Sequence, residues 1–220
     1  MNISVGKNAP GEGYFTGSVI SGQSFKVTIT NSGYTGSVTI YANSASSDTG
    51  YQLGSIYVQN GTGTGYFTIR SVLGLTDSSR KLTAIDNKQN RASIVVGVWF
   101  QVTMTVECLN PDYNNVTLYC GQKYTTKQKF ASLPYGDRSR LCNHPVAIYA
   151  TRTHQLATVP IQDAGPKTTT DNYWNKTGVP QYPDRGIDGS DGTWDALGLS
   201  SYYQCSSPAY GSETVQWRFT

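Results

Sequence analysis

The sequence has few charged residues and few groups that commonly bind metals. Only 14% of its 220 residues are charged, it contains 2 His and 4 Cys, and its formal net charge is +3. The first 100 residues hold 7 Lys and Arg against 4 Asp and Glu, which leaves 10 of each from the totals of 17 and 14. Because the basic residues are scattered, we expect no nucleic-acid surface.

Long apolar segments are also missing. The longest apolar run, from Ile94 to Phe100, is far shorter than the ~20 residues of a membrane-spanning helix. The first residues, Met1 to Ser4, lack the basic and apolar regions of a signal peptide. We therefore expect no membrane span, and either a trimmed mature form or another export route, for instance within a phage particle.

The cysteines and histidines do not form a metal-binding pattern. No C-x-x-C pair is present, and His144 and His154 are not at metal-finger spacing, so we expect no metal and no cofactor. All four cysteines lie in the second part of the chain: Cys108, Cys120, Cys142 and Cys205. An even number in a chain rich in Ser, Thr, Tyr and Gly predicts two disulfides, with three possible connectivities, and an extracellular, cell-surface or virion location.

Glycine and tyrosine are abundant, with 23 and 16 residues, and this composition predicts an all-β fold with tight turns. In the first hundred residues, short alternating runs are separated by Gly, Asn and Ser. Their apolar members are Phe25, Val27, Ile29, Val38, Ile40, Ile56, Val58, Tyr66, Phe67, Ile69, Leu82 and Ala84, followed by the run 94–98. This spacing predicts an antiparallel β-sandwich over residues 1–102.

The order of these strands resembles the immunoglobulin-like modules of bacterial surface proteins over residues 14–100. The segments that carry the resemblance are S-F-K-V-T-I-T, G-S-V-T-I-Y-A, G-Y-F-T-I and L-T-A-I-D-N-K-Q-N-R-A-S. It implies a spacer or an assembly surface, through which copies of the chain could form a homo-oligomer.

Two later segments carry carboxylates beside glycines. Val159–Pro166 reads as a strand that delivers Asp163 to a turn ended by Gly165 and Pro166. This Asp163, and the Asp188 of the second segment, could simply cap turns, which is common for Asp. They could instead serve a shallow polysaccharide-binding cleft, because loops on a rigid scaffold present functional groups to bulky substrates.

The second segment, Gly186–Leu199, places Asp188 ahead of a short predicted helix. Asp191 or Thr193 could cap this helix, and Gly198 would end it. The side chains expected to face inward are Trp194, Leu197 and Leu199.

These motifs, with L-P-Y-G at 133–136 and V-Q-W-R-F at 215–219, resemble the double-psi β-barrel of the rare lipoprotein A and expansin families. The resemblance covers Thr103–Thr220, and it implies a closed six-stranded barrel domain over residues 103–220. It also implies that Asp188 is the essential acid and Asp163 a supporting partner. The sequence departs from the lytic members at Phe130, where they carry His, and the acidic residue expected further upstream is not apparent.

A long polar loop from Lys167 to Arg185 separates the two acidic segments and contains Tyr173, Trp174 and Tyr182. A loop of this length inside a compact domain is usually functional or disordered. Its aromatic rings could bind substrate by stacking on sugars. Alternatively, Tyr173 and Trp174 could pack over the barrel and hold the loop.

Two functions follow from these features. The first is an extracellular protein that binds peptidoglycan or another polysaccharide, with lytic-transglycosylase-like, hydrolytic or glycan-loosening activity at Asp188 and Asp163. The second is a non-catalytic structural subunit of a phage particle or surface fibre that uses the barrel as an interaction platform. An enzyme requires an open groove at the two Asp residues, whereas a subunit requires this face or the sandwich to be covered by neighbours.

Overall fold

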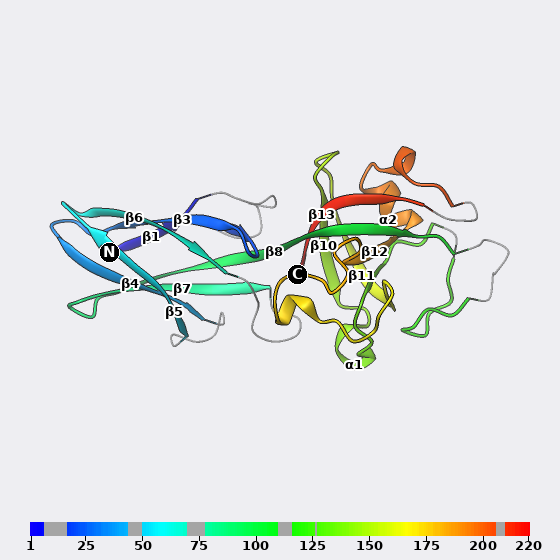
Figure 1. Cartoon of the computed structure of the whole chain (residues 1–220), viewed down its shortest axis with the longest axis horizontal. Helices are drawn as coiled ribbons and strands as arrows, with labels where there is room; N and C mark the ends of the chain where they lie inside the picture. The colour runs from blue at the N-terminus through cyan, green and yellow to red at the C-terminus, as the bar shows by residue number, and fades with distance from the viewer. Residues whose placement is uncertain (7–16, 44–49, 70–77, 110–115, 126, 206–209) are drawn as a thin grey trace. The chain divides into compact units, whose positions relative to one another are not determined.

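Among the residues that the structure describes, 54% lie in strands and 9% in helices, so the fold is all-β, as the sequence predicts. The computed structural model describes residues 1–6, 17–43, 50–69, 78–109, 116–125, 127–205 and 210–220. It divides into two compact units, Met1–Trp99 and Phe100–Thr220. Strand β8 (Arg91–Glu107) contributes its first residues to unit 1 and its last residues to unit 2 (Figure 1). The boundary between the units therefore lies within one strand.

Unit 1 contains two groups of paired strands. One sheet has the order β1-β3-β6, and the other has the order β5-β4-β7-β8, with β2 added parallel to β8. The strands are β1 (Asn2–Val5), β2 (Ser18–Ile20), β3 (Ser24–Thr30), β4 (Gly36–Asn43), β5 (Tyr51–Val58), β6 (Thr62–Thr68) and β7 (Ser79–Asp86).

The side chains of β3 illustrate why these segments form strands. Phe25, Val27 and Ile29 are buried, while Ser24 and Lys26 between and beside them are exposed. Successive side chains of a strand point to opposite faces, so this alternation buries one face. The all-β expectation is met here, and the specific immunoglobulin-like arrangement stays a prediction.

Unit 2 contains a closed six-stranded barrel. Its strands pair in the order β12-β9-β11-β10-β13-β8, and β12 pairs again with β8 to close it. Two pairs are parallel, β9 with β11 and β8 with β12, and the other four are antiparallel. The elements are β9 (Ala131–Leu133), α1 (Arg138–Leu141), β10 (Pro145–Ala150), β11 (Leu156–Ala164), η1 (Tyr173–Asn175), β12 (Ile187–Ser190), α2 (Asp191–Ala196), η2 (Ser200–Tyr202) and β13 (Ser212–Phe219).

An aromatic cluster fixes the long loop of this unit. Tyr173 and Trp174 are 1% and 0% exposed, and their rings pack at 6.1 and 5.6 Å from the ring of Trp217. The indole of Trp217 donates a hydrogen bond of 2.7 Å to the Tyr173 hydroxyl, which in turn donates one of 3.0 Å to the Gly186 carbonyl. The prediction that Tyr173 and Trp174 bind sugar is therefore wrong. Their large apolar surfaces are buried, and the loop packs down through them.

Helix α2 follows the predicted segment with a different cap. The Ser190 side chain, and not Asp191 or Thr193, is the N-cap, and it accepts a hydrogen bond from the Thr193 amide. The helix ends ahead of Gly198, whose positive φ of 68° is the left-handed conformation expected after a C-cap. As predicted, the three apolar side chains Trp194, Leu197 and Leu199 are fully buried.

The four cysteines form two disulfides, as predicted. Cys108 pairs with Cys205, and Cys120 pairs with Cys142. The first joins the end of β8 to the segment before β13, and the second joins the segment before β9 to the end of α1. Both lie within unit 2 and connect parts of the chain that carry or flank its carboxylates.

Candidate functional site

The barrel brings the two predicted Asp residues to opposite sides of one strand. Ser132 of β9 pairs with Asp163 of β11 on one side and with Asp188 of β12 on the other. Because neighbouring strands lie about 4.8 Å apart, the two Asp backbones are separated by roughly 10 Å. The register shifts between Ile161 and Asp163, and such a bulge re-aims the side chain that follows it.

A third carboxylate, Glu107, joins this pair. Glu107 is the last residue of β8 and pairs with Ser190 at the end of β12. It accepts a hydrogen bond from the Ser132 hydroxyl and shares another with the Asp163 side chain. The site therefore contains three carboxyl groups around Ser132.

The environment of Glu107 favours its neutral form. Burial is the main cause that raises its pKa to about 8, and the negative charges of Asp163 and Asp188 and the hydrogen bond with Asp163 raise it further. The Ser132 hydrogen bond acts in the opposite direction. A carboxyl with this pKa keeps its proton at neutral pH.

Asp188 is also shifted toward its protonated form, but less strongly. Burial raises its pKa to about 6, a hydrogen bond from the Thr105 hydroxyl and the charge of Arg185 lower it, and Asp163 raises it. A Cβ atom at Gly165 would lie only 3.2 Å from Asp188 Oδ2. The glycine of the D-A-G-P turn thus allows the backbone to approach this carboxyl closely.

The Asp163 carboxylate is held in place by backbone groups. Its Oδ1 accepts hydrogen bonds of 2.9 Å from the amides of Tyr119 and Ala164. Tyr119 precedes Cys120, so the disulfide to Cys142 also anchors this donor. Asp163 is therefore a fixed group that influences the other two carboxyls.

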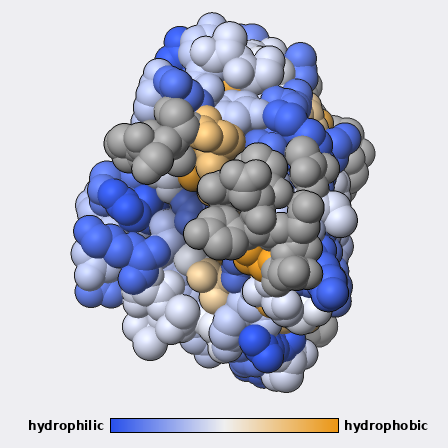
Figure 2. All heavy atoms as spheres, turned by 90° about the vertical axis from the view of Figure 1, so that its right-hand side faces the viewer, coloured by the Kyte–Doolittle hydropathy of each residue, from blue (hydrophilic) through white to orange (hydrophobic). Residues whose placement is uncertain are grey.

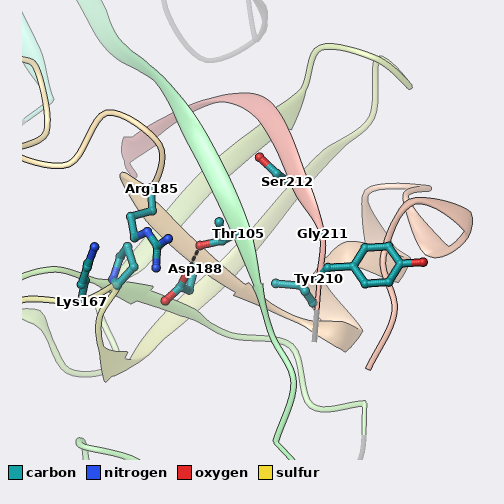
Figure 3. Close-up of a pocket in the computed structure, with 9 residues that line it drawn as sticks. Thr105, Lys167, Arg185, Asp188, Tyr210, Gly211 and Ser212 are labelled. Atoms are coloured by element: carbon teal, nitrogen blue, oxygen red, sulfur yellow. Dashed lines mark hydrogen bonds between the residues drawn. The ribbon is translucent and has the colours of Figure 1, made fainter. Parts of the chain in front are cut away.

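Asp188 opens into a pocket of about 400 Å³. Figure 3 shows Arg185 and Lys167 on one side of Asp188 and Tyr210 on the other. The lining residues are Thr105, Val106, Pro166, Lys167, Arg185, Asp188, Tyr210, Gly211 and Ser212. The two ends of the predicted loop form a wall, as expected, but Asp163 is not among the lining residues, so the expected groove shared by both Asp side chains is corrected to a pocket at Asp188.

The remaining predicted residues have different positions. Tyr182 is partly exposed and lies under Lys167, whose Nζ is 4.7 Å from the centre of its ring. Its role in binding sugar stays a prediction. Phe130 is fully buried and packs edge-on against Tyr124 at 6.3 Å, so this position, where the lytic barrels that the sequence resembles carry His, belongs to the core. Tyr210, not singled out from the sequence, is 62% exposed at the pocket.

Glu107 could have been found from the sequence. It is the single charged residue in the alternating run from Phe100 to Glu107, and it directly precedes Cys108. The strand and the neighbouring cysteine fix the backbone at this position, so a lone charged side chain there is a candidate site residue. Tyr210 gave no comparable signal, because it lies in a Gly- and Ser-rich segment without alternation.

The remaining described surface was compared with the features of membrane, metal and apolar binding sites. On the face shown in Figure 2, hydrophobic residues appear only in small patches among hydrophilic ones. Within the described ranges, no helix has the length and apolar character to cross a membrane, and no three His, Cys, Asp or Glu side chains form a group that could hold a metal ion. Comparison with known protein families and with curated proteins finds no match to this chain.

Proposed function

We propose that this chain acts on an extracellular polysaccharide and cleaves its glycosidic bonds, with Asp188 as the proton donor. One observation supports this most directly. Asp188 is the carboxyl that lines the open pocket, and its pKa is raised to about 6, mainly by burial. A general acid works best when its pKa is close to the working pH.

The chemistry requires Asp188 to be protonated when substrate binds. Its proton moves to the glycosidic oxygen as the bond from that oxygen to the anomeric carbon breaks. The carbon then bonds to the oxygen of water or, in a lytic reaction, to the oxygen of a hydroxyl of the same sugar. In both cases the proton of that oxygen passes to the Asp188 carboxylate, which restores the acid. Asp163 helps Asp188 to keep its proton, because its charge adds to the effect of burial in raising the pKa of Asp188. Glu107 shares a hydrogen bond with Asp163.

The pocket walls suit a sugar chain. Tyr210 offers an exposed ring at one side, and aromatic rings can pack on the apolar faces of sugars. The two disulfides are typical of oxidising compartments outside the cytosol. The resemblance of the acidic motifs to the rare lipoprotein A and expansin barrels supports the same substrate class.

The first experiment is the release of soluble fragments from purified peptidoglycan and from a panel of linear polysaccharides. We expect the wild type to release fragments from at least one of them, and Asp188→Asn to reduce release at least 100-fold, because general acid catalysis typically contributes 10²–10⁴-fold. Asp195→Asn is the matched control, since Asp195 is an exposed carboxyl of α2 outside the pocket. Mass analysis of the new chain ends separates hydrolysis from a lytic reaction.

Two results would change the conclusion. If Asp188→Asn releases fragments as fast as the wild type, Asp188 is not the acid. If neither protein releases fragments from any polymer, the barrel is a non-catalytic platform, and the structural-subunit alternative replaces the enzymatic one.

A further inference from the structure

We propose that the pocket at Asp188 selects polysaccharides whose sugars carry a carboxylate, which Arg185 and Lys167 bind. This inference rests on the proposed function for the identity of the ligand as a polysaccharide. The preference for an acidic sugar is a separate property, because it depends on cations that are not required for proton transfer.

Arg185 is positioned to bind an anion. Its guanidinium lines the pocket, and its Nε and Nη2 donate hydrogen bonds of 3.1 and 3.0 Å to one oxygen of Asp184. These bonds use one edge of a planar group that has five N–H donors, and planar donors of this kind fit carboxylates well. The Asp184 side chain is 63% exposed, so water screens much of its charge. Asp184 therefore orients Arg185 without cancelling its charge.

Lys167 supplies a second cation on the same wall. Its φ of 62° places it in the left-handed region, which is uncommon for a residue with a side chain. Its Nζ lies over the Tyr182 ring at 4.7 Å, a contact that holds the ammonium group beside the pocket. The turn after β11 thus directs Lys167 toward the same space as Arg185 (Figure 3).

The charge balance of the pocket favours a singly charged ligand group. When Asp188 holds its proton, Arg185 and Lys167 leave this wall net positive, because the charge of the exposed Asp184 is screened by water. A neutral glycan leaves this charge without a partner, whereas one carboxylate compensates it. Because the Arg185 charge lowers the pKa of Asp188, a carboxylate bound to Arg185 would also help Asp188 to keep its proton.

The opposite wall gives the sugar chain a direction. Tyr210 is exposed and lies across the pocket from the two cations, with its ring extending away from Asp188 (Figure 3). A chain of sugars that reaches from the Tyr210 ring to the two cations passes Asp188, with the carboxylate of one member toward Arg185 and Lys167. The pocket is therefore matched to a chain of sugars that includes acidic members.

The test compares polymers that differ only in the carboxylate. Polygalacturonate and hyaluronan are each measured beside their own carboxyl-reduced forms, by calorimetry and by affinity electrophoresis at low and physiological salt. We expect the wild type to bind at least one acidic polymer about 10-fold more tightly than its reduced form, with the difference decreasing as salt increases. The double variant Lys167→Gln/Arg185→Gln should lose this preference. Lys176→Gln/Arg140→Gln, which changes two exposed cations outside the pocket, should keep it.

The outcomes separate this inference from the proposed function. Asp188→Asn should keep the preference for acidic polymers even though it no longer cleaves. If binding prefers the acidic polymers but no cleavage occurs, the enzymatic proposal fails and the inference stands. The inference is overturned if the wild type binds none of the four polymers, or if it binds each acidic polymer no more tightly than its reduced form. It is also overturned if the double variant Lys167→Gln/Arg185→Gln keeps the wild-type preference.

Discussion

Three carboxyl groups around one serine have different environments, and this difference gives them different tasks. Glu107 is the most strongly shifted toward its neutral form, Asp188 is shifted less and faces the pocket, and Asp163 is held by two backbone amides. Because the pKa values of Glu107 and Asp188 differ, Glu107 can keep its proton at a pH where Asp188 transfers its own.

The raised pKa of Glu107 predicts how stability depends on pH. Because its folded pKa of about 8 exceeds the ordinary 4.5, the folded state binds more protons than the unfolded state between these values. The contribution of Glu107 to the free energy of unfolding is therefore highest below pH 4.5 and decreases as the pH rises to 8. Between pH 6 and 8, this contribution should fall by about 2 kcal/mol in the wild type, and Glu107→Gln should abolish that decrease.

Urea unfolding of both proteins at pH 5, 6, 7 and 8 measures this effect as a difference. The subtraction removes the contributions of other groups, such as His144, whose pKa burial lowers. Asp184→Asn serves as the control, because the pKa of Asp184 is lowered by Arg185 and its titration lies below this range. Parallel curves for the wild type and Glu107→Gln above pH 6 would show that Glu107 is ionised in the folded protein.

Thr105 gives a second prediction at the residue scale. Its hydroxyl donates a hydrogen bond to Asp188 and lowers the pKa of that carboxyl, which burial raises to about 6. Thr105→Val removes the donor, so the pKa of Asp188 should increase by about one unit. The upper limb of the pH–activity profile should then move to higher pH, together with the Asp188 titration followed by NMR. Thr158→Val, on an exposed position of β11, should leave both unchanged.

At the scale of elements, Ser190 connects the end of β12 to α2 and to the segment before β9. Its buried hydroxyl accepts hydrogen bonds from the amides of Thr193 and Phe130, and it donates one to the Gln128 carbonyl. Ser190→Ala leaves these buried groups without their partner. We expect a loss of about 2–4 kcal/mol in the free energy of unfolding, from the cap and the buried bonds together.

Thermal and urea unfolding of Ser190→Ala measure this loss, with Ser200→Ala as a control at an exposed helix position. Because β12 carries Asp188, the variant should also weaken the alignment of this carboxyl with the pocket. A loss below about 0.5 kcal/mol would contradict this prediction and would show that water replaces the hydrogen bonds of the Ser190 hydroxyl in the variant.

For the whole molecule, the two disulfides should stabilise the fold unequally. Cys108 and Cys205 are separated by 97 residues, and Cys120 and Cys142 by 22. A longer closed loop removes more entropy from the unfolded chain. We expect Cys108→Ser/Cys205→Ser to cost about 1 kcal/mol more than Cys120→Ser/Cys142→Ser in urea unfolding. Equal costs would show that the loop-entropy effect is offset by structure that persists in the unfolded state.

The local pattern of the sequence determined the elements and several constraints on them. The closed six-stranded barrel was expected from the resemblance to the rare lipoprotein A and expansin barrels, and not from the local pattern. Alternation and turn residues predicted the all-β chain, and the even number of cysteines predicted two disulfides. These features depend on neighbours along the chain, where period-2 burial and turn preferences act.

Tertiary structure alone decided what the polar and aromatic side chains do. It placed Glu107 with Asp163 and Asp188 through strand pairing across β8, β9, β11 and β12. It buried Tyr173 and Trp174 in the barrel and left Tyr210 at the pocket. Composition does not distinguish a ring that packs inward from one that binds a ligand, because both have the same apolar faces. Burial, and with it the pKa of each carboxyl, arises only when distant strands close around the same space.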